Sequence, residues 1–231
     1  MGLAGSSVAA MVVGTVFIMI FGMATVSLVE SVNESIKNTD YELPDPEVNL
    51  VSVTDKVEST GPANSLSVTA SGSGYATGGS CATTGGGTGL VVSVTQTTGS
   101  VDSISVVQPG SGYEIGDVIT IAGCGNGDAT GTISSLHDQN IITIRNTGSE
   151  TVELSHISIT LSDTSPILQG TPFLFTDHYS GGNLYLFPGE EVSTDAFSLS
   201  VASHGFSIED DPDRAFLAIY NHNDAVSVTI T

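Results

Sequence analysis

Between Ser7 and Val29 the chain carries almost only apolar and small residues, and no charged side chain occurs before Glu30. As a helix this run would be about 35 Å long, enough to cross a hydrocarbon core of about 30 Å. Lipid offers no hydrogen-bond partners to the backbone, so such a run is expected to be helical. Apolar residues keep helical spacing as far as Ile36. The pattern predicts a single membrane-spanning helix within residues 1–38.

Two kinds of processed N-terminus are alternatives to an uncleaved anchor. A secretory signal peptide has a basic n-region and a shorter apolar core, whereas nothing basic precedes this run. A type IV prepilin leader is cut just before the apolar helix. Gly5 would mark that cut, but residues 1–4 contain no Lys or Arg. We therefore expect an intact anchor, followed by a stalk at residues 39–46 that Pro44 and Pro46 stiffen.

Short apolar runs separated by turn residues predict β-strands in the rest of the chain. The expected strands are 48–54, 140–146, 151–161, 173–175, 184–187, 196–201, 215–220 and 225–231. In the first, Val48 and Leu50 face one side and Val53 the other. In the third, the apolar parity switches, which predicts a bulge near Ser155-His156. The spacing is typical of an antiparallel β-sandwich, which we place at residues 47–56 plus 137–231.

Residues 57–136 have a different pattern, because they contain an internal repeat. Residues 64–78 align with residues 102–116 at an offset of 38, and eight of the fifteen pairs are identical. The shared motif is Gly-Ser-Gly-Tyr, which ends at Tyr75 and at Tyr113. We expect an inserted β-repeat module with glycines at positive φ in the turns. The two tyrosine rings should form its small core, with their hydroxyls at the rim.

The only two cysteines, Cys81 and Cys124, both fall in this repeat module. A disulfide between them would close a loop of about 44 residues and contribute roughly 3–4 kcal/mol in the loop-entropy model. Two buried free thiols are the alternative. Two cysteines without a nearby histidine do not make a zinc site.

The chain has a formal net charge of −21 and only four basic residues: Lys37, Lys56, Arg145 and Arg214. Nucleic acid is therefore not an expected partner, since phosphate binding needs clustered Lys and Arg. The low Lys content, the Ser, Thr and Gly richness, the two cysteines and the sequon at Asn33 favour an extracellular location for the bulk of the chain. Asn33 is the candidate glycosylation site.

Candidate chemistry is sparse, and neither catalytic residues nor a cofactor are expected. The five histidines show no metal-ligand spacing, and no nucleophile elbow occurs. Weak candidates for Ca²⁺ ligands come from the densest acidic cluster: Glu209, Asp210, Asp211 and Asp213. This cluster lacks the Gly and the terminal Glu of an EF-hand loop, so a solvated turn is the favoured interpretation. Within the anchor, Ala10 and Gly14 form a small-xxx-small pair that would allow helix packing.

These features together resemble the F/G family of archaellum (archaeal flagellum) stator proteins, relatives of archaellins and archaeal type IV pilins. Met1-Gly2-Leu3 runs directly into an apolar helix, and a polar stalk and an extended strand at 49–53 follow. The stretch 142–152 then contains the turn Asn-Thr-Gly-Ser. The resemblance covers residues 1–56 and 137–231, and the Met-Gly start favours the F branch of the family.

The resemblance implies a cell-membrane protein with one span and an immunoglobulin-like sandwich in the extracellular or pseudoperiplasmic space. It implies binding to the S-layer or to other archaellum subunits, and a homo- or hetero-oligomer formed through the helix and the sandwich. Two alternatives stay open: a filament-forming archaellin or pilin, and a surface adhesin that binds glycan or Ca²⁺. The family has no counterpart of residues 57–136, which resemble Gly-Ser-Gly-Tyr repeats of viral tail and other surface proteins.

Overall fold

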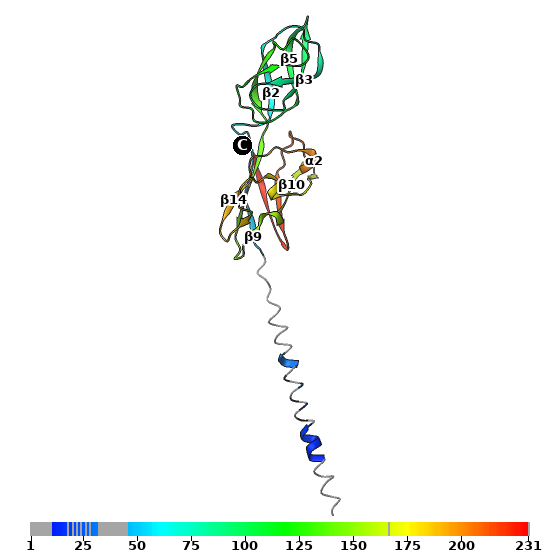
Figure 1. Cartoon of the computed structure of the whole chain (residues 1–231), viewed down its shortest axis with the longest axis vertical. Coiled ribbons are helices and arrows are strands. Elements are labelled where there is room, and N and C mark those ends of the chain that lie inside the picture. Colours follow the sequence, from blue (N-terminus) through cyan, green and yellow to red (C-terminus); the bar gives the residue numbers. More distant parts are fainter. Residues whose placement is uncertain are drawn as a thin grey trace, which may run out of the picture. The chain divides into compact units, whose positions relative to one another are not determined.

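Figure 1 shows the computed structural model, which describes residues 11–17, 19, 21, 23, 25, 27, 29–31, 46–165 and 167–230. The chain divides into two compact units, Met1–Pro44 and Asp45–Thr231. In the first unit every described residue is helical. Among the described residues, no helix is both long enough and apolar enough to cross a membrane. The other residues of the predicted span, and residues 39–45 of the stalk, lie outside the described residues, so the transmembrane helix stays a prediction.

The second unit consists mainly of β-strands in sandwich-like sheets, which confirms the expected mainly β class. The strands that flank the repeat form what we call the sandwich (residues 46–56 and 137–230). They are β1 (Val48–Lys56), β8 (Gln139–Asn146), β9 (Val152–Glu153), β10 (Ser158–Thr164), β11 (Ile167–Gln169), β12 (Phe173–Leu174), β13 (Tyr185–Leu186), β14 (Glu191–Ser193), β15 (Arg214–Ile219) and β16 (His222–Ile230). Three short helices lie between them, η1 (Leu154–His156), η2 (Phe175–His178) and α2 (Val201–His204).

The sandwich strands enclose one apolar core. The large sheet has the order β11-β10-β15-β16-β1-β8-β14, β12 also pairs with β10, and β13 pairs separately with β9. Strand β15 illustrates the pattern, because Ala215, Leu217 and Ile219 are buried and the alternate residues are exposed. Phe175 and Phe206 fill the same core. Each large side chain buried in this way contributes about 1.5–3 kcal/mol.

The alternation along β1 shifts at a bulge. Its register with β8 slips just after Leu50, and burial then passes from Val48 and Leu50 to Val53 and Asp55. The expected regular alternation is therefore wrong beyond Leu50: Val53 shares the buried face with Leu50, and Val51 is exposed. The shift also buries a carboxylate, Asp55, near the end of the strand.

The expected third strand is interrupted by more than a bulge. A turn of 3₁₀ helix, η1, occupies residues 154–156 between β9 and β10. Leu154 and Ile157 at its two ends are both buried. The turn moves the chain from the β9–β13 pair to the large sheet, where β10 pairs with β15. This transfer between sheets is the physical reason why the apolar residues change from even-numbered to odd-numbered positions along this stretch.

Two further expectations about the strands need correction. The sandwich is not wholly antiparallel, because β1 and β16 run parallel, with Val53 opposite Val228. No strand forms at 196–201, where Phe197 makes only an isolated bridge to Asn140. The residues after that bridge instead begin α2. Strands β11 and β14 have three residues each. Such short strands cannot be recognised from the alternation of apolar and polar residues.

Residues 57–136, which we call the insert, form a second sheet with its own core. Its strands are β2 (Ala63–Ala70), β3 (Gly78–Thr84), β4 (Val91–Thr97), β5 (Ser100–Gln108), β6 (Val118–Ile121) and β7 (Thr130–Leu136). The first repeat copy supplies β2–β4 and the second supplies β5–β7. The sheet order is β2-β7-β6-β3-β4-β5, so the first strand of each copy pairs with the last strand of the other. The copies exchange strands, and β2 also packs against β5.

The backbone geometry repeats together with the sequence. Gly72 and Gly74 have φ values of +59° and +72°, and their counterparts Gly110 and Gly112 have +65° and +74°. These values lie in the left-handed region, where a residue with a Cβ atom is strained. Matching positive φ values in both copies support the expected role of the glycines in the turns.

The two repeat tyrosines are buried, as expected for a small core. Each ring covers a glycine of the other copy, because a Cβ atom on Gly125 would lie 2.5 Å from the Tyr75 ring and one on Gly87 would lie 2.9 Å from the Tyr113 ring. The expected position of the hydroxyl at the rim is wrong for Tyr75, whose buried hydroxyl donates to the Ile121 carbonyl at 2.8 Å. The tyrosine–glycine contacts therefore hold one copy against the other.

Deletion of residues 59–136, with a short Gly-containing turn in their place, is expected to leave a sandwich that unfolds cooperatively. The last pair of the β1–β8 ladder is Lys56 opposite Gln139, and the sandwich core contains no residue of the insert. Thermal unfolding followed by circular dichroism tests this. As a control, deletion of residues 222–230 should abolish the transition, because β16 joins β1 to β15. A non-cooperative melt of the insert deletion would contradict the prediction.

Candidate functional site

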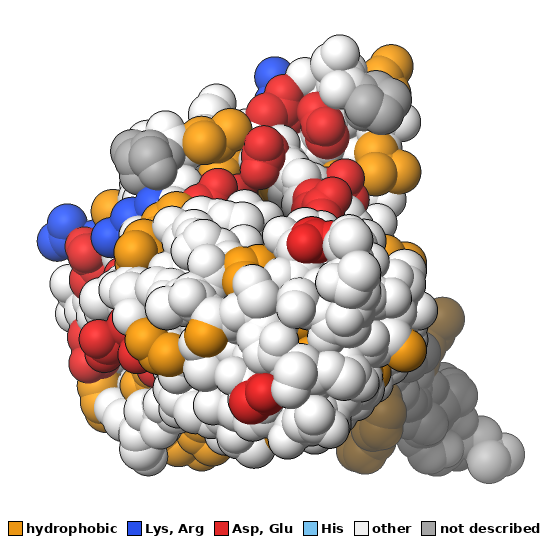
Figure 2. Space-filling view, turned by 90° about the horizontal axis from the view of Figure 1, so that it is seen from above, with side chains coloured by type: hydrophobic (Ala, Val, Ile, Leu, Met, Phe, Trp, Pro, Cys, Tyr) orange, Lys and Arg blue, Asp and Glu red, His pale blue; other side chains and the backbone are white. Residues whose placement is uncertain are grey.

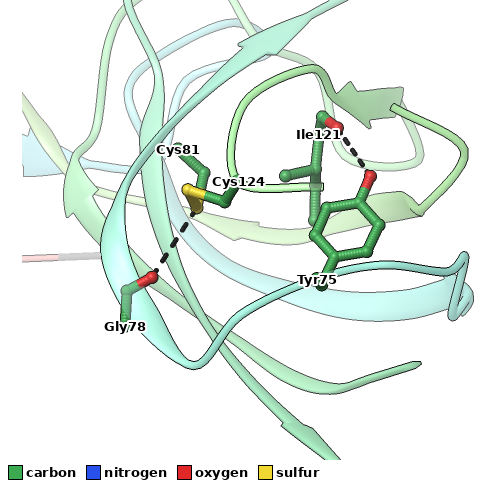
Figure 3. Close-up of a disulfide and its surroundings, with 5 residues drawn as sticks. All are labelled: Tyr75, Gly78, Cys81, Ile121 and Cys124. Atoms are coloured by element: carbon green, nitrogen blue, oxygen red, sulfur yellow. Dashed lines mark hydrogen bonds between the residues drawn. A yellow bond between two sulfur atoms is a disulfide. The ribbon is translucent and has the colours of Figure 1, made fainter. Parts of the chain in front are cut away.

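Cys81 and Cys124 are joined by a disulfide, with their Cα atoms 5.5 Å apart (Figure 3). Cys81 lies on β3 of the first copy and Cys124 follows β6 of the second, so the bond links the two copies. Cys124 has a φ of +71°, and its counterpart in the first copy is Gly86, with a φ of +64°. The 3.9 Å approach of Cys81 Sγ to the Gly78 carbonyl is a contact rather than a hydrogen bond, because a disulfide sulfur carries no proton.

A cleft of about 600 Å³ opens where β1 and β8 give way to the insert. It is lined by Val57, Asn64, Leu136, His137, Asp138, Ile208, Glu209 and Asp211. Three of these residues are carboxylates, whereas none is Lys or Arg. Figure 2 shows the largest group of acidic side chains on the visible face near its top, with others at the left and lower down. In the cleft, three carboxylates give a concave surface of negative charge.

Two buried polar side chains of the β1–β8 ladder belong to the same region. Asp55 and Asn140 lie opposite each other, and only 2% and 1% of their surfaces are exposed. Asn140 Nδ2 donates to Asp55 Oδ1 at 3.3 Å, whereas Asn140 Oδ1 has no hydrogen-bond partner. Burial, followed by the charges of Asp138 and Asp211, raises the pKa of Asp55 to about 6. Asp55 therefore carries a negative charge that its surroundings disfavour.

A histidine pair forms a second polar cluster in the sandwich. His178 Nε2 and His204 Nε2 are 2.8 Å apart, and the His178 ring stacks on Phe197 with centroids 3.8 Å apart. His204 Nδ1 accepts the Ser200 N–H at 3.0 Å, so neutral His204 carries its proton on Nε2 and donates it to His178. Burial lowers the pKa of both, that of His204 to about 4. The pair is thus a neutral hydrogen bond within an aromatic cluster.

The predicted Ca²⁺ ligands are not brought together as a set. Glu209 and Asp211 line the acidic cleft. Asp210 accepts a hydrogen bond from the backbone of its own turn, and Asp213 accepts one from a threonine of β10. Within the part of the chain that the structure describes, no group of three or more His, Cys, Asp or Glu side chains is placed to hold a metal ion.

The two candidate sites of the N-terminal segment stay predictions. Asn33, the glycosylation candidate, and Ala10, one half of the helix-packing pair, lie outside the described residues. Gly14, the other half, has open space where a Cβ atom would be.

The sequence analysis does not identify Asn140, Asp55 or the histidine pair. For Asn140 the sequence does contain a signal, because Asn140 is two residues before Ile142 and is therefore a polar residue on the core face of β8. Asp55 has none, since the bulge after Leu50 places it on the buried face. His178 and His204 are 26 residues apart, and no helical or strand spacing connects them.

Comparison with known proteins gives no relative. No protein-family model, curated protein or solved structure matches the chain. Evidence for a function therefore comes from the resemblance in the sequence and from the geometry of the described residues.

Proposed function

We propose that the chain is a structural, non-enzymatic surface protein that residues 1–38 hold in the cytoplasmic membrane, with the sandwich and the insert outside. We further propose that it serves the archaellum stator by binding the S-layer or other archaellum subunits and thereby anchoring the motor. The resemblance of residues 1–56 and 137–231 to the F/G family of stator proteins supports this assignment. An immunoglobulin-like interpretation of the sandwich belongs to the same proposal.

The observation that carries the proposal is the position of the insert on β1. The chain reaches the sandwich at Val48, and the insert begins after Lys56, nine residues later. A strand of that length extends roughly 30 Å. Strand β8 returns antiparallel to Asn146, opposite Val48. The N-terminal segment and the insert therefore attach at opposite ends of the β1–β8 pair, an arrangement suited to presenting the insert away from a membrane.

A surface adhesin is the second candidate, and the outer face of the insert favours it. Hydroxyl groups pair across neighbouring strands, with oxygen–oxygen distances of 2.6 Å for Ser65 and Ser135 and for Thr69 and Thr132. Exposed hydroxyls paired across neighbouring strands suit contact with glycans. The same surface would also serve the lattice contact of a stator protein.

Deletion of the gene in the native cell separates these candidates. Loss of a stator protein is expected to leave assembled filaments that do not rotate, and reintroduction of the gene should restore swimming. Loss of the filaments would instead identify a pilin or archaellin, and unchanged swimming would favour the adhesin. Mass spectrometry of the native chain gives an independent test, because loss of a leader ending near Gly5 would contradict the stator assignment.

A further inference from the structure

We infer that the acidic cleft at the junction of sandwich and insert is a docking site for a lysine or arginine side chain of a partner protein. The carboxylates of Asp138, Glu209 and Asp211 would hold the cationic group beside the ring of His137. All four residues line the cleft. The inference states the chemistry of the partner, and it does not require the partner to belong to the archaellum or to the S-layer.

The first argument is the unpaired imidazole of His137. Only 8% of this residue is exposed, and in the described part of the chain its ring nitrogens have no hydrogen-bond partner. Neither nitrogen is one of the completely buried unpaired atoms of the described residues, so the ring is accessible from the cleft that it lines. Buried polar groups rarely stay unpaired. A ligand in the cleft would supply the missing partner.

The ring of His137 is suited to accept a hydrogen bond there. Burial lowers its pKa, against the opposing effect of the Glu209 and Asp138 charges. The imidazole is therefore neutral at pH 7, and a neutral imidazole has one acceptor nitrogen. The two carboxylates that act on the ring are members of the cleft lining, so acceptors of the two kinds lie together.

The second argument is that the carboxylates of the cleft are free. In the part of the chain that the structure describes, the side chains of Asp138, Glu209 and Asp211 form neither a hydrogen bond nor an ion pair. Asp210, in the same acidic run, instead accepts the Ser207 N–H at 2.6 Å and shapes its own turn. The loop thus uses Asp210 for its fold and leaves its two neighbours available to a ligand.

The balance of donors and acceptors indicates a cation with several N–H groups. Carboxylates accept hydrogen bonds only, whereas a lysine ammonium has three donors and an arginine guanidinium has five, with no acceptor on either. Among the described residues no group of side chains is placed to hold a metal ion, so the cation should be an organic one.

The apolar part of the lining fits the rest of such a side chain. Val57, Leu136 and Ile208 line the same cleft. The methylene stem of lysine or arginine packs on apolar surface while its charged head stays in a polar environment. A cleft of about 600 Å³ exceeds a single side chain, so a short segment with adjacent basic residues would fill it.

Charge complementarity favours a partner protein over a second copy of this chain. The chain has a formal net charge of −21 and only four basic residues. Lys56, one residue before the cleft residue Val57, is already paired with Glu58 at 3.1 Å. Two such acidic chains repel each other, whereas a basic segment is attracted and oriented by the cleft.

A docked side chain would contact both the sandwich and the insert. Asp138 lies just before β8, and Glu209 and Asp211 lie in the loop between α2 and β15. Asn64, also in the lining, belongs to β2 of the insert. Binding should therefore fix this loop against the base of the insert.

The test is calorimetric titration of the full-length protein in detergent with the peptide Gly-Lys-Lys-Gly, acetylated and amidated at its ends. Binding should weaken as salt is added and should vanish when both lysine side chains are acetylated. The double variant Glu209→Gln/Asp211→Asn should bind at least tenfold more weakly. Its thermal unfolding should be unchanged, because these side chains form no internal bond.

The matched control is Glu150→Gln/Glu191→Gln, which removes two exposed carboxylates near the other end of β8. It changes the net charge equally and should bind like the natural protein. A third variant, His137→Leu, should fold at least as stably, because an unpaired polar ring is removed, and should bind several-fold more weakly. Unchanged affinity in His137→Leu would overturn the inference, since this ring is the feature that points to a ligand.

Other outcomes also overturn the inference. They are absence of binding by the natural protein, equal binding of the acetylated peptide, and an equal loss in the control, which would indicate attraction by net charge alone. Tighter binding of spermidine than of the peptide would assign the cleft to a free polyamine instead of a protein. Sedimentation gives the last check, because self-association of the natural protein that the double variant abolishes would assign the cleft to a second copy.

Discussion

Replacement of both cysteines by serine is expected to lower the free energy of unfolding of the insert by about 4 kcal/mol and to leave the sandwich almost unchanged. Cys81 and Cys124 are 43 residues apart, and closing a loop of that size removes about 4 kcal/mol of chain entropy from the unfolded state. The core of the insert is smaller than that of the sandwich, with 13 buried residues against 19. The loss should therefore be a large fraction of its total stability. Differential scanning calorimetry, with separate transitions for the two cores, measures it.

A matched pair of variants separates the lost bond from the strain at Cys124. With Cys81→Ser held constant, Cys124→Gly should be about 0.5–1 kcal/mol more stable than Cys124→Ser, because the φ of +71° there favours glycine. Reduction of the natural protein should lower the same transition. If the sandwich transition fell equally, the two cores would not be independent and the prediction would be wrong.

Asp55 and His204 are expected to have opposite effects on how the free energy of unfolding of the sandwich depends on pH. The pKa of Asp55 is raised to about 6. Its contribution to stability is therefore complete below pH 3.8 and is lost as the pH rises through about 6. The pKa of His204 is lowered to about 4, so its contribution is complete above pH 6.5 and is lost as the pH falls through about 4. Each shift corresponds to about 3 kcal/mol.

Because the two contributions to stability partly cancel in the natural protein, variants that remove one of them should show the other. On acidification from pH 6.5 to 4, Asp55→Asn should lose about 2 kcal/mol more stability than the natural protein does. His204→Gln should show a change of similar size in the opposite direction. Burial also lowers the pKa of His137 and His178, so the natural protein should still weaken moderately in acid. Urea unfolding at several pH values measures these slopes, and parallel curves for the three proteins would contradict the assignment.

Much of the architecture can be predicted because buried and exposed residues alternate regularly along the longer strands. Strand β8 and strand β15 show clear alternation, so their positions follow from the pattern. The repeat can be recognised from sequence identity, and its glycines predict the turns with positive φ. The exchange of strands between the copies cannot be predicted from local sequence. The alternation of apolar and polar residues along a strand shows which face is buried but not which strand is its neighbour.

The polar sites are harder to predict because each depends on a departure from regular geometry. A one-residue slip after Leu50 decides that Asp55 is buried, and alternation alone would place it differently. The contact between His178 and His204 joins η2 to α2, two short helices without periodicity. The acidic cluster at 209–213 illustrates the opposite error, since a dense charge run in the sequence brings only Glu209 and Asp211 to a common cleft.

The exchange of strands in the insert has an evolutionary consequence. A single copy cannot complete the sheet by itself, because its first strand pairs with the last strand of a second copy. An ancestral chain with one copy would have needed an identical partner, and gene duplication would have fused that homodimer into one polypeptide. After fusion the two halves were free to differ. Asp128, which accepts the N–H and the hydroxyl of Ser73 at 2.8 Å each, stands where the first copy has the buried Leu90. Cys124 stands where the first copy has Gly86, so the crosslink between the halves uses a position at which they differ.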